Sequence, residues 1–223
     1  KRVLRSANKM SNPYFQFKQF TVWHDKCAMK VGTDGVLLGA WTSVQGARRV
    51  LDVGTGTGLV ALMLAQRSPA DVKIVALEVD TAAVEQAKEN VARSFWKEQI
   101  EVVQADFNQY HSSGKFDVIV SNPPYFVGSL KCPDVQRNAA RHATSLTYEE
   151  LLKGVAGLLA EDGTFTARQL NVITKPGGVP KRVLIAFSFG NRECVVEELL
   201  TEIARHKYSE EYIMLTREYY LKM

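Results

Sequence analysis

The chain has 223 residues, a length that suits one large domain or a domain with a small appendage. Hydrophobic residues make up 46% of the chain, enough to bury a sizeable core, and no apolar run reaches the length of a membrane span. The net charge of +4 is mildly basic, which allows a nucleic-acid partner but does not require one. The three cysteines lie far apart and lack metal-ligand spacing, so we expect a reducing, cytoplasmic setting without a disulfide framework or a metal.

The chain opens with a basic, polar stretch at residues 1–13, which we expect to be a flexible arm. A solvated terminus is one interpretation of the arm, and a segment that contacts phosphates is the other. The aromatic-rich residues 15–22 predict a strand or a hairpin. An apolar run follows at residues 36–41, where we expect a helix with Thr33 or Asp34 as its cap.

From Arg49 onward, strand patterns alternate with helical patterns, which is typical of βαβ units and a parallel sheet. Residues 194–204 fit a helix and a strand equally well. The expected strands are 50–53, 72–77, 100–103, 116–120, 163–166, 170–174 and 182–187. The expected helices are 59–66, 81–93, 146–159 and 208–220.

A glycine turn with the pattern Asp52-x-Gly54-x-Gly56-x-Gly58 follows the first of these strands and opens a helix. Glycines let the backbone approach a ligand closely, and the amino end of a helix favours negative charge. The spacing differs from the dinucleotide pattern G-x-G-x-x-G, and a glycine turn alone is weak evidence for a ligand site.

Carboxylates stand at the ends of the next two strands. Glu78 ends the second strand, where it is placed to accept hydrogen bonds from both hydroxyls of a ribose. Asp106 follows the third strand and is a candidate acceptor for an adenine amino group. Either carboxylate alone would be an ordinary solvated cap, but an ordered set at successive strand ends favours a functional site.

Asn122-Pro123-Pro124-Tyr125 follows the fourth strand. Two prolines cannot continue a strand, so the chain leaves the sheet in a stiff turn at its carboxyl edge, where open α/β sheets bind ligands. The side-chain carbonyl of Asn122 and the backbone carbonyl of Pro123 can accept both hydrogens of an NH2 group. Tyr125 offers a flat face on which a planar base can stack. Alone, the four residues also fit a simple turn.

The order of the glycine turn, Glu78, Asp106 and Asn122 resembles that of the class I S-adenosylmethionine-dependent methyltransferases, over about residues 48–188. The resemblance implies a Rossmann-like α/β fold with a mostly parallel seven-stranded sheet and helices on both faces. It also implies a single methyltransferase domain over residues 14–223, made of an N-terminal strand and helix extension (14–47), a cofactor-binding core (48–188) and a C-terminal extension (189–223).

Four further segments are similar to the bacterial tRNA1(Val) (adenine(37)-N6)-methyltransferase family: residues 17–20 (FKQF), 24–35 (HDKCAMKVGTDG), 208–212 (YSEEY) and 215–217 (LTR). With them, the similarity spans nearly the whole chain. It implies S-adenosylmethionine as the cofactor, tRNA as the partner, and methylation of the adenine beside the anticodon, within the anticodon loop. We expect a monomer without a membrane or a metal.

The resemblance also implies roles for individual residues. The ribose of the cofactor would lie on Glu78 and its adenine near Asp106, and Asp52 would orient backbone amides or the methionine end of the cofactor. Lys30 and Thr33 would line the mouth of the cofactor site with Asp34, unless they only start a helix. The expected cofactor-binding set is Lys30, Thr33, Asp52, Gly54, Gly56, Gly58, Glu78, Asp106 and Asn122. The expected catalytic set is Asn122, Pro123, Pro124 and Tyr125.

No strong general base is needed for this chemistry, so we expect His24 and His142 to be structural or to contact RNA. Five basic residues are candidates for phosphate contacts near the active edge, although each alone would also fit a solvated charge. They are Arg137, Arg141, Lys175, Lys181 and Arg182.

Two alternatives stay open at this stage, an rRNA guanine-N2 methyltransferase and a non-catalytic RNA-binding module that kept the fold. Chain length argues against two other relatives. The segment before Asp52 is too short for the helical substrate domain of a glutamine methyltransferase. The chain also has no room for the separate recognition domain of a DNA adenine enzyme.

The connection between the expected strands 163–166 and 170–174 is too short for the fold. A crossover between parallel strands needs at least about a dozen residues, usually with a helix. We therefore expect a segment to be absent from the numbered chain near Thr166-Ala167.

Overall fold

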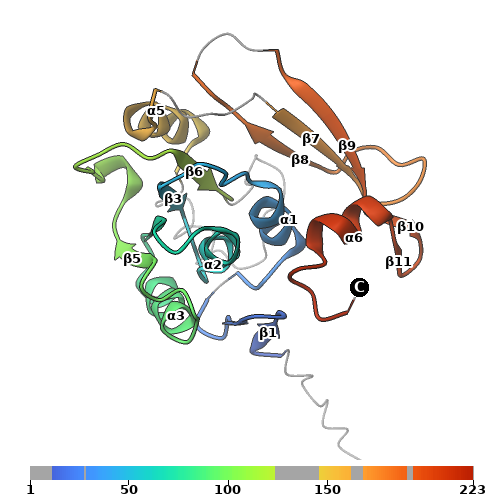
Figure 1. Cartoon of the computed structure of the whole chain (residues 1–223), viewed down its shortest axis with the longest axis horizontal. Coiled ribbons are helices and arrows are strands. Elements are labelled where there is room, and N and C mark those ends of the chain that lie inside the picture. The colour runs from blue at the N-terminus through green and yellow to red at the C-terminus, as the bar shows by residue number, and fades with distance from the viewer. Residues whose placement is uncertain (1–11, 28, 124–145, 162–167, 190–192, 223) are drawn as a thin grey trace, which may run out of the picture.

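The structure is a computed structural model, and it describes residues 12–27, 29–123, 146–161, 168–189 and 193–222 (Figure 1). The described elements, in chain order, are β1 (Tyr14–Gln16), β2 (Thr21–Trp23), α1 (Thr33–Trp41), β3 (Arg49–Val53), α2 (Leu59–Arg67), β4 (Lys73–Glu78), α3 (Thr81–Ala92), β5 (Ile100–Gln104), the 3-10 turn η1 (Phe107–Gln109), β6 (Val118–Ser121), α5 (Tyr148–Leu158), β7 (Arg168–Ile173), β8 (Arg182–Ala186), β9 (Val195–Leu200), β10 (Glu202–Ala204), β11 (Lys207–Tyr208) and α6 (Glu210–Thr216).

The central sheet has the strand order β5-β4-β3-β6, and all its neighbouring strands are parallel. Its strands alternate side chains between two apolar layers, as strands buried on both faces do. Val50 of β3 joins the cluster that contains Leu64 of α2, whereas Leu51 joins the cluster against which Leu151 of α5 packs. Helices therefore cover both faces of this sheet, as expected (Figure 1).

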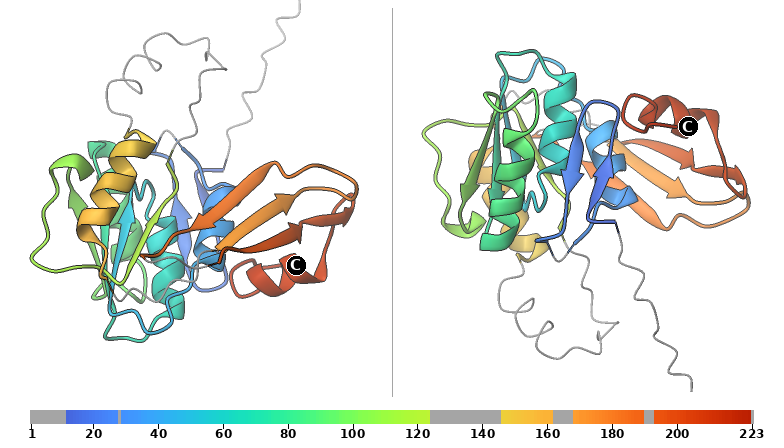
Figure 2. Two further views of the ribbon diagram at one scale, coloured as in Figure 1. Left: turned by 90° about the horizontal axis from the view of Figure 1, so that it is seen from above. Right: turned by 90° about the horizontal axis from the view of Figure 1, so that it is seen from below.

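The remaining long strands form a separate mixed sheet of order β8-β7-β9, in which β7 is antiparallel to β8 and parallel to β9. One face of this sheet packs against α1 and α6 through Leu37 and Tyr212, and Figure 2 shows α6 along one side of it. A single seven-stranded sheet is thus not confirmed, because the described long strands form one sheet of four strands and another of three. The strand expected at 163–166 lies outside the described residues, as does the junction Thr166-Ala167.

The hairpin expected at residues 15–22 is confirmed. β1 and β2 pair antiparallel, with Tyr14 opposite Trp23. The stacked rings of Phe17 and Phe20, whose centroids are 4.7 Å apart, close the end of the hairpin. A bridge from Phe17 to Tyr220 brings the C-terminal segment against it.

Two local expectations are corrected, and one open alternative is resolved. The cap of α1 is Gly32, without a side-chain hydrogen bond, so neither Thr33 nor Asp34 caps this helix. Residues 194–204 are mainly strand, as β9 and β10. The helix expected at 208–220 is only α6, which begins late because the Ser209 hydroxyl accepts a hydrogen bond from the amide of Tyr212 and caps it.

Helices α1 and α2 pack closely against each other, and α2 begins directly after the glycine turn. A Cβ at Gly39 would come within 2.7 Å of the Met63 sulfur, so only glycine permits this approach. None of the helices in the described part of the chain has the length and apolar character that a membrane span requires.

Candidate functional site

The glycine turn after β3 has a backbone that requires glycine. Gly54, Gly56 and Gly58 have φ values of 72°, 57° and 81°, in the left-handed region that side chains with a Cβ rarely adopt. Gly58 lies against Ala87 of α3. At Gly54 and Gly56, an added Cβ would meet nothing within 4 Å. The turn therefore leaves open space over its first two glycines, where a ligand can approach the backbone.

The Asp52 side chain stabilises this turn from the interior of the protein. Its side chain is buried, and Oδ2 accepts hydrogen bonds from the Thr55 hydroxyl at 2.6 Å and from the Ala61 amide at 3.2 Å. Burial raises the pKa of Asp52 to about 6, although the bonds from Thr55 and Ala61 oppose that rise. Asp52 thus fixes the turn and the start of α2 from within the protein.

Glu78 bonds directly to the glycine turn. Its Oε2 accepts a hydrogen bond from the Gly56 amide at 2.9 Å. Its Oε1 accepts from the amides of Val79 and Asp80 at 2.9 and 3.0 Å. The structure therefore brings together the ends of β3 and β4, as the order of motifs predicts.

Asp106 lies at the same edge, one strand farther along. The Ala105 amide donates to the Glu78 backbone carbonyl at 3.0 Å, which places the end of β5 beside the end of β4. The exposed Asp106 side chain accepts a hydrogen bond from the Asn108 amide at 2.9 Å and caps η1. The cap interpretation is thus observed for this residue.

Asn122 and Pro123 leave β6 beside the glycine turn. Ser121 pairs with Val53, and its hydroxyl donates to the Val53 carbonyl at 2.9 Å, so Asn122 follows at the level of Gly54. On the other side, a Cβ at Gly35 would lie 3.9 Å from Asn122 Nδ2. The half-buried Asn122 side chain therefore lies next to the first turn of α1. Pro124 and Tyr125 lie outside the described residues, as do Arg137, Arg141 and His142.

The start of α1 forms the remaining part of the candidate site. Lys30 and Thr33 are exposed there. The Asp34 carboxylate forms an ion pair with the Arg182 guanidinium, which links α1 to β8. The charge of Arg182 is therefore already paired within the protein, unlike that of a side chain kept for a phosphate. Lys175 and Lys181, which flank the turn between β7 and β8, are exposed.

Two residues near the site, Asn90 and Cys27, were not among the residues that the sequence motifs predicted. Asn90 of α3 is fully buried and bonds to the carbonyl of Thr57 in the glycine turn at 2.9 Å. Cys27 is half-buried, and burial, followed by the negative charges of Glu78 and Asp80, raises its pKa to about 11. Asn90 could have been found as a polar residue beside the apolar stripe of α3, whereas nothing in the sequence placed Cys27 near Glu78.

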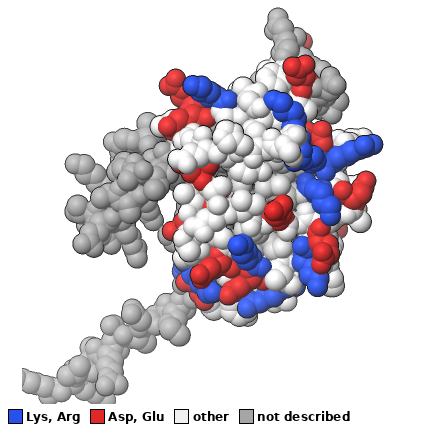
Figure 3. All heavy atoms as spheres, turned by 90° about the vertical axis from the view of Figure 1, so that its left-hand side faces the viewer, with Lys and Arg blue, Asp and Glu red and all other residues white. Residues whose placement is uncertain are grey.

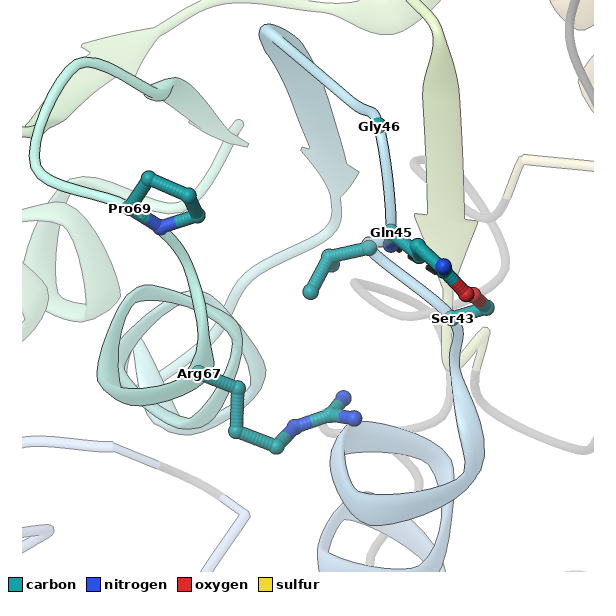
Figure 4. Close-up of a pocket in the computed structure, with 6 residues that line it drawn as sticks. Ser43, Gln45, Gly46, Arg67 and Pro69 are labelled. Atoms are coloured by element: carbon teal, nitrogen blue, oxygen red, sulfur yellow. Dashed lines mark hydrogen bonds between the residues drawn. The ribbon is translucent and has the colours of Figure 1, made fainter.

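A surface pocket of about 420 Å³ lies elsewhere, near the amino ends of the strands (Figure 4). Its lining contains none of the expected site residues. Arg67 in its wall donates to the carbonyls of Gly39 and Thr42 at 2.6 Å each, which closes the end of α1. We therefore place the functional site at the carboxyl edge of the central sheet, because the candidate ligand-binding side chains lie there and none of them lines this pocket. The lining residues are Ser43, Val44, Gln45, Gly46, Arg67 and Pro69.

Comparison with known proteins finds a family model and relatives that match most of the chain. Residues 30–167 match the family model of the Methyltransferase small domain. A tRNA1(Val) (adenine(37)-N6)-methyltransferase of Bacteroides thetaiotaomicron is 69% identical over 236 positions, which take in 96% of this chain and 100% of the relative. The enzyme of the same name from Aeromonas hydrophila subsp. hydrophila is 45% identical, over 95% of this chain and 99% of the relative.

One solved structure shows the fold. A predicted O-methyltransferase from Agrobacterium tumefaciens superposes with a TM-score of 0.55 and 18% identity, over 83% of this chain and 96% of that protein. At this identity the match supports the methyltransferase-like fold alone. The central parallel sheet with helices on both faces is the part of the architecture that this likeness and the described strands share.

Proposed function

Because the chain belongs to the tRNA1(Val) (adenine(37)-N6)-methyltransferase family, we propose that it methylates the exocyclic amine of the adenine beside the anticodon of a tRNA. The proposal includes S-adenosylmethionine as the methyl donor and the cytoplasm as the setting. The cofactor site and the binding of the base rest on residues at the carboxyl edge of the central sheet.

The observation that carries the proposal is the register of β3 and β6. Val53 and Ser121 are partners, so the glycine turn and Asn122 leave neighbouring parallel strands at the same level. Neighbouring strands lie about 4.8 Å apart. A ligand over Gly54 and a base held by Asn122 would therefore be in contact, which is what transfer of a group between them requires.

The residues at this edge fit S-adenosylmethionine, which supplies an electrophilic methyl group when it is bound. The space over Gly54 and Gly56 admits a ligand without a clash. Glu78 has two carboxylate oxygens at the rim of this space, and Oε2 accepts one hydrogen bond from the described residues, that of the Gly56 amide. A carboxylate offers about four lone-pair sites, so Glu78 retains capacity to accept a ribose hydroxyl.

Asn122 and Pro123 would act on the base. The Asn122 side-chain carbonyl and the Pro123 backbone carbonyl accept the two hydrogens of the adenine amine, which directs the nitrogen lone pair out of the ring plane. Such positioning supplies most of the rate enhancement, and no strong base is required. His24 fits this view, since its ring is buried and its Nε2 lies 2.9 Å from the Asn12 carbonyl, in a structural contact. Stacking of the base on Tyr125 remains part of the proposal.

Lys175 and Lys181 support an RNA partner, because their exposed ammonium groups extend from the turn that follows β7. The face shown in Figure 3 carries basic and acidic side chains interspersed, so no broad basic field marks an RNA surface there. The anticodon loop is a suitable target, since an unpaired base turns out of the stack at little cost.

Transfer of labelled methyl groups to competing substrates tests the proposal. The protein would be incubated with tRNA, an anticodon stem-loop, ribosomal RNA, duplex DNA and a glutamine-bearing protein, followed by nucleoside mass spectrometry. We expect N6-methyladenosine in tRNA only. N2-methylguanosine in ribosomal RNA would replace the substrate assignment, and cofactor binding without transfer to any substrate would indicate a non-catalytic RNA-binding module.

A further inference from the structure

The hairpin of β10 and β11 carries three basic side chains at its tip. The two strands pair antiparallel, and Arg205 and His206 form the turn between the partners Ala204 and Lys207. Arg205, His206 and Lys207 are all exposed. We call residues 205–207 the basic tip. Its three side chains offer hydrogen-bond donors to solvent at consecutive positions.

The backbone of the basic tip suits glycine better than histidine. His206 has a φ of 60°, and every other described residue with a positive φ is a glycine. A residue with a Cβ adopts this conformation at a cost, and hairpin turns that require it usually place Gly or Asn there. The turn alone therefore does not account for a histidine between an arginine and a lysine. Residues in such conformations cluster at functional sites.

The charges of the basic tip are not neutralised by neighbouring acidic groups. No salt bridge within the described part of the chain includes Arg205 or Lys207. Arg168 of β7, in contrast, pairs with Glu197 of β9 at 2.6 Å. The glutamates at 210–211 lie in the first turn of α6, where negative charge stabilises the amino end of a helix. The tip therefore keeps its charge for a partner outside the chain.

The base of the hairpin is fixed to the rest of the protein. The Ser209 amide donates to the Thr201 carbonyl at 3.0 Å, which joins the two ends of the hairpin. The ring of Tyr208 lies against that of the buried Tyr212, with the centroids 5.3 Å apart. A binding element that is already ordered loses less conformational entropy when its partner binds.

The hairpin and the turn between β7 and β8 lie at the same end of the mixed sheet. The Thr201 amide donates to the Ile173 carbonyl at 2.8 Å, so β10 begins beside the end of β7. Figure 1 shows β10 and β11 at the right of the molecule, beyond the end of β9. The turn after β7 carries the exposed Lys175 and Lys181. The basic tip and these two lysines thus form one basic end of the sheet.

This end of the sheet is linked to the site of the base but lies apart from it. Arg182, the first residue of β8, pairs with Asp34 in the first turn of α1, where Gly35 lies next to Asn122. From β8 to β9 the sheet extends over two strand spacings, roughly 10 Å at about 4.8 Å each. An RNA with its target base at Asn122 must therefore extend past α1 and across this end of the sheet to reach the tip. The tip meets a different part of the RNA from the base that is methylated.

We propose that the basic tip binds backbone phosphates in the stem that carries the anticodon loop of the tRNA. The inference rests on the proposed function, because it takes tRNA as the substrate. The Arg205 guanidinium and the Lys207 ammonium pair with phosphate oxygens, and the His206 imidazole donates an N–H to another phosphate oxygen. Phosphate contacts of this kind carry no sequence information and orient the nucleic acid. Here they place the loop over Asn122.

The double variant Arg205→Ala/Lys207→Ala tests this role. Filter binding to unmodified tRNA over a range of salt concentrations gives the affinity and its salt dependence, and steady-state methylation gives kcat and KM. We expect roughly tenfold weaker binding near physiological salt and a slope smaller by about 1.5, since each phosphate contact contributes about 0.7 to 0.9. The KM for tRNA should rise accordingly. The kcat and the affinity for S-adenosylmethionine should equal those of the parent.

A matched control and a further variant separate binding from folding. Lys88→Ala/Lys97→Ala removes the same charge from exposed positions on α3 and just before β5, and it should bind tRNA as the parent does. Glycine fits the φ of residue 206 without strain. His206→Gly should therefore raise the midpoint of thermal unfolding while it weakens tRNA binding. A lower midpoint would show that the imidazole serves the fold, which contradicts the proposal.

The failure of this inference differs from the failure of the proposed function. Affinity and salt slope that stay unchanged in Arg205→Ala/Lys207→Ala, or that fall equally in the control pair, would overturn the role of the basic tip while the parent still methylates tRNA. A parent that binds tRNA without methylating it would remove the proposed function alone, and the same binding comparison would still decide the role of the tip. A parent that does not bind tRNA would overturn both.

Discussion

Asn90 and Trp23 are joined by two hydrogen bonds, in which Asn90 Oδ1 accepts from the Trp23 amide and Nδ2 donates to the Trp23 carbonyl, each at 2.9 Å. The same Nδ2 donates to the Thr57 carbonyl in the glycine turn. One buried amide therefore fixes the N-terminal hairpin and the glycine turn relative to each other. Because buried backbone groups left without partners are costly, this amide helps to stabilise the position of the turn.

The first prediction is that Asn90→Ala raises the KM for S-adenosylmethionine by roughly tenfold with little change in kcat, since tenfold corresponds to about 1.4 kcal/mol. Gln99→Ala is the control, because Gln99 is also a buried amide that bonds a backbone carbonyl, that of Pro69 at 2.8 Å, but at the amino end of the sheet. Both variants lose stability, and only Asn90→Ala should change the KM. Equal effects of the two variants on the KM would refute a positioning role.

Much of the site follows from sequence because it consists of strand ends. A glycine turn, Glu78, Asp106 and Asn122 each follow a short apolar strand, and parallel strands bring their carboxyl ends to one edge. The position of Asn90 beside the apolar stripe of α3 marks it as a polar residue worth noting, but its partners Trp23 and Thr57 escape such reasoning, since they lie far from it in the chain. The ion pair of Asp34 and Arg182 is of the same kind, since it joins α1 to β8 across a long stretch of sequence.

The arrangement of the strands could be predicted less fully from the sequence than the residues of the site. Periodicity located the strands of the central sheet, but it does not show which strands pair, so the division into four and three strands could not be foreseen. Residues 194–204 were ambiguous because Val195 and Val196 are followed by glutamates and leucines, a sequence that suits either element. Pairing with β7 decides in favour of a strand.

The second prediction concerns the pH dependence of stability. The pKa of Asp52 rises from its ordinary value of 3.8 to about 6 in the folded protein. The folded state therefore binds more protons than the unfolded state between these values, and the stability contributed by protonated Asp52 is lost as pH rises through 6. Relative to Asp52→Asn, the free energy of unfolding of the parent should fall by about 2 to 3 kcal/mol between pH 4 and pH 7. Urea denaturation of both proteins at the two pH values measures it, and a constant difference would contradict it.

The third prediction is that Glu78→Gln weakens binding of S-adenosylmethionine at least tenfold. The variant keeps the size of the side chain but removes the charge that accepts hydrogen bonds from Gly56, Val79 and Asp80, and charged acceptors contribute about 1.5 to 3 kcal/mol each. Calorimetric titration gives the affinity. Glu101→Gln, at an exposed position of β5, is the control and should bind normally. Equal affinity of the two variants would remove Glu78 from the site.

The fourth prediction is that Lys175→Ala and Lys181→Ala weaken tRNA binding and reduce its salt dependence. Each phosphate contact contributes about 0.7 to 0.9 to the slope of log affinity against log salt concentration. Filter binding across a range of salt concentrations measures the slope. Lys97→Ala is the control, since Lys97 is exposed just before β5, at the amino end of the sheet. A slope that changes with Lys97→Ala, or not with the other two, would show that RNA lies elsewhere.

The central claim is that Asn122 holds the amine that is methylated, and Asn122→Ala tests it most directly. Bulk tRNA that lacks the modification would be incubated with S-adenosylmethionine and either the parent, Asn122→Ala, or Asn108→Ala, an exposed asparagine of η1, followed by nucleoside mass spectrometry and calorimetry of cofactor binding. The account predicts N6-methyladenosine with the parent and with Asn108→Ala, and none with Asn122→Ala although that variant still binds the cofactor with normal affinity. Near-normal methylation by Asn122→Ala, or loss of its cofactor binding, would contradict the account.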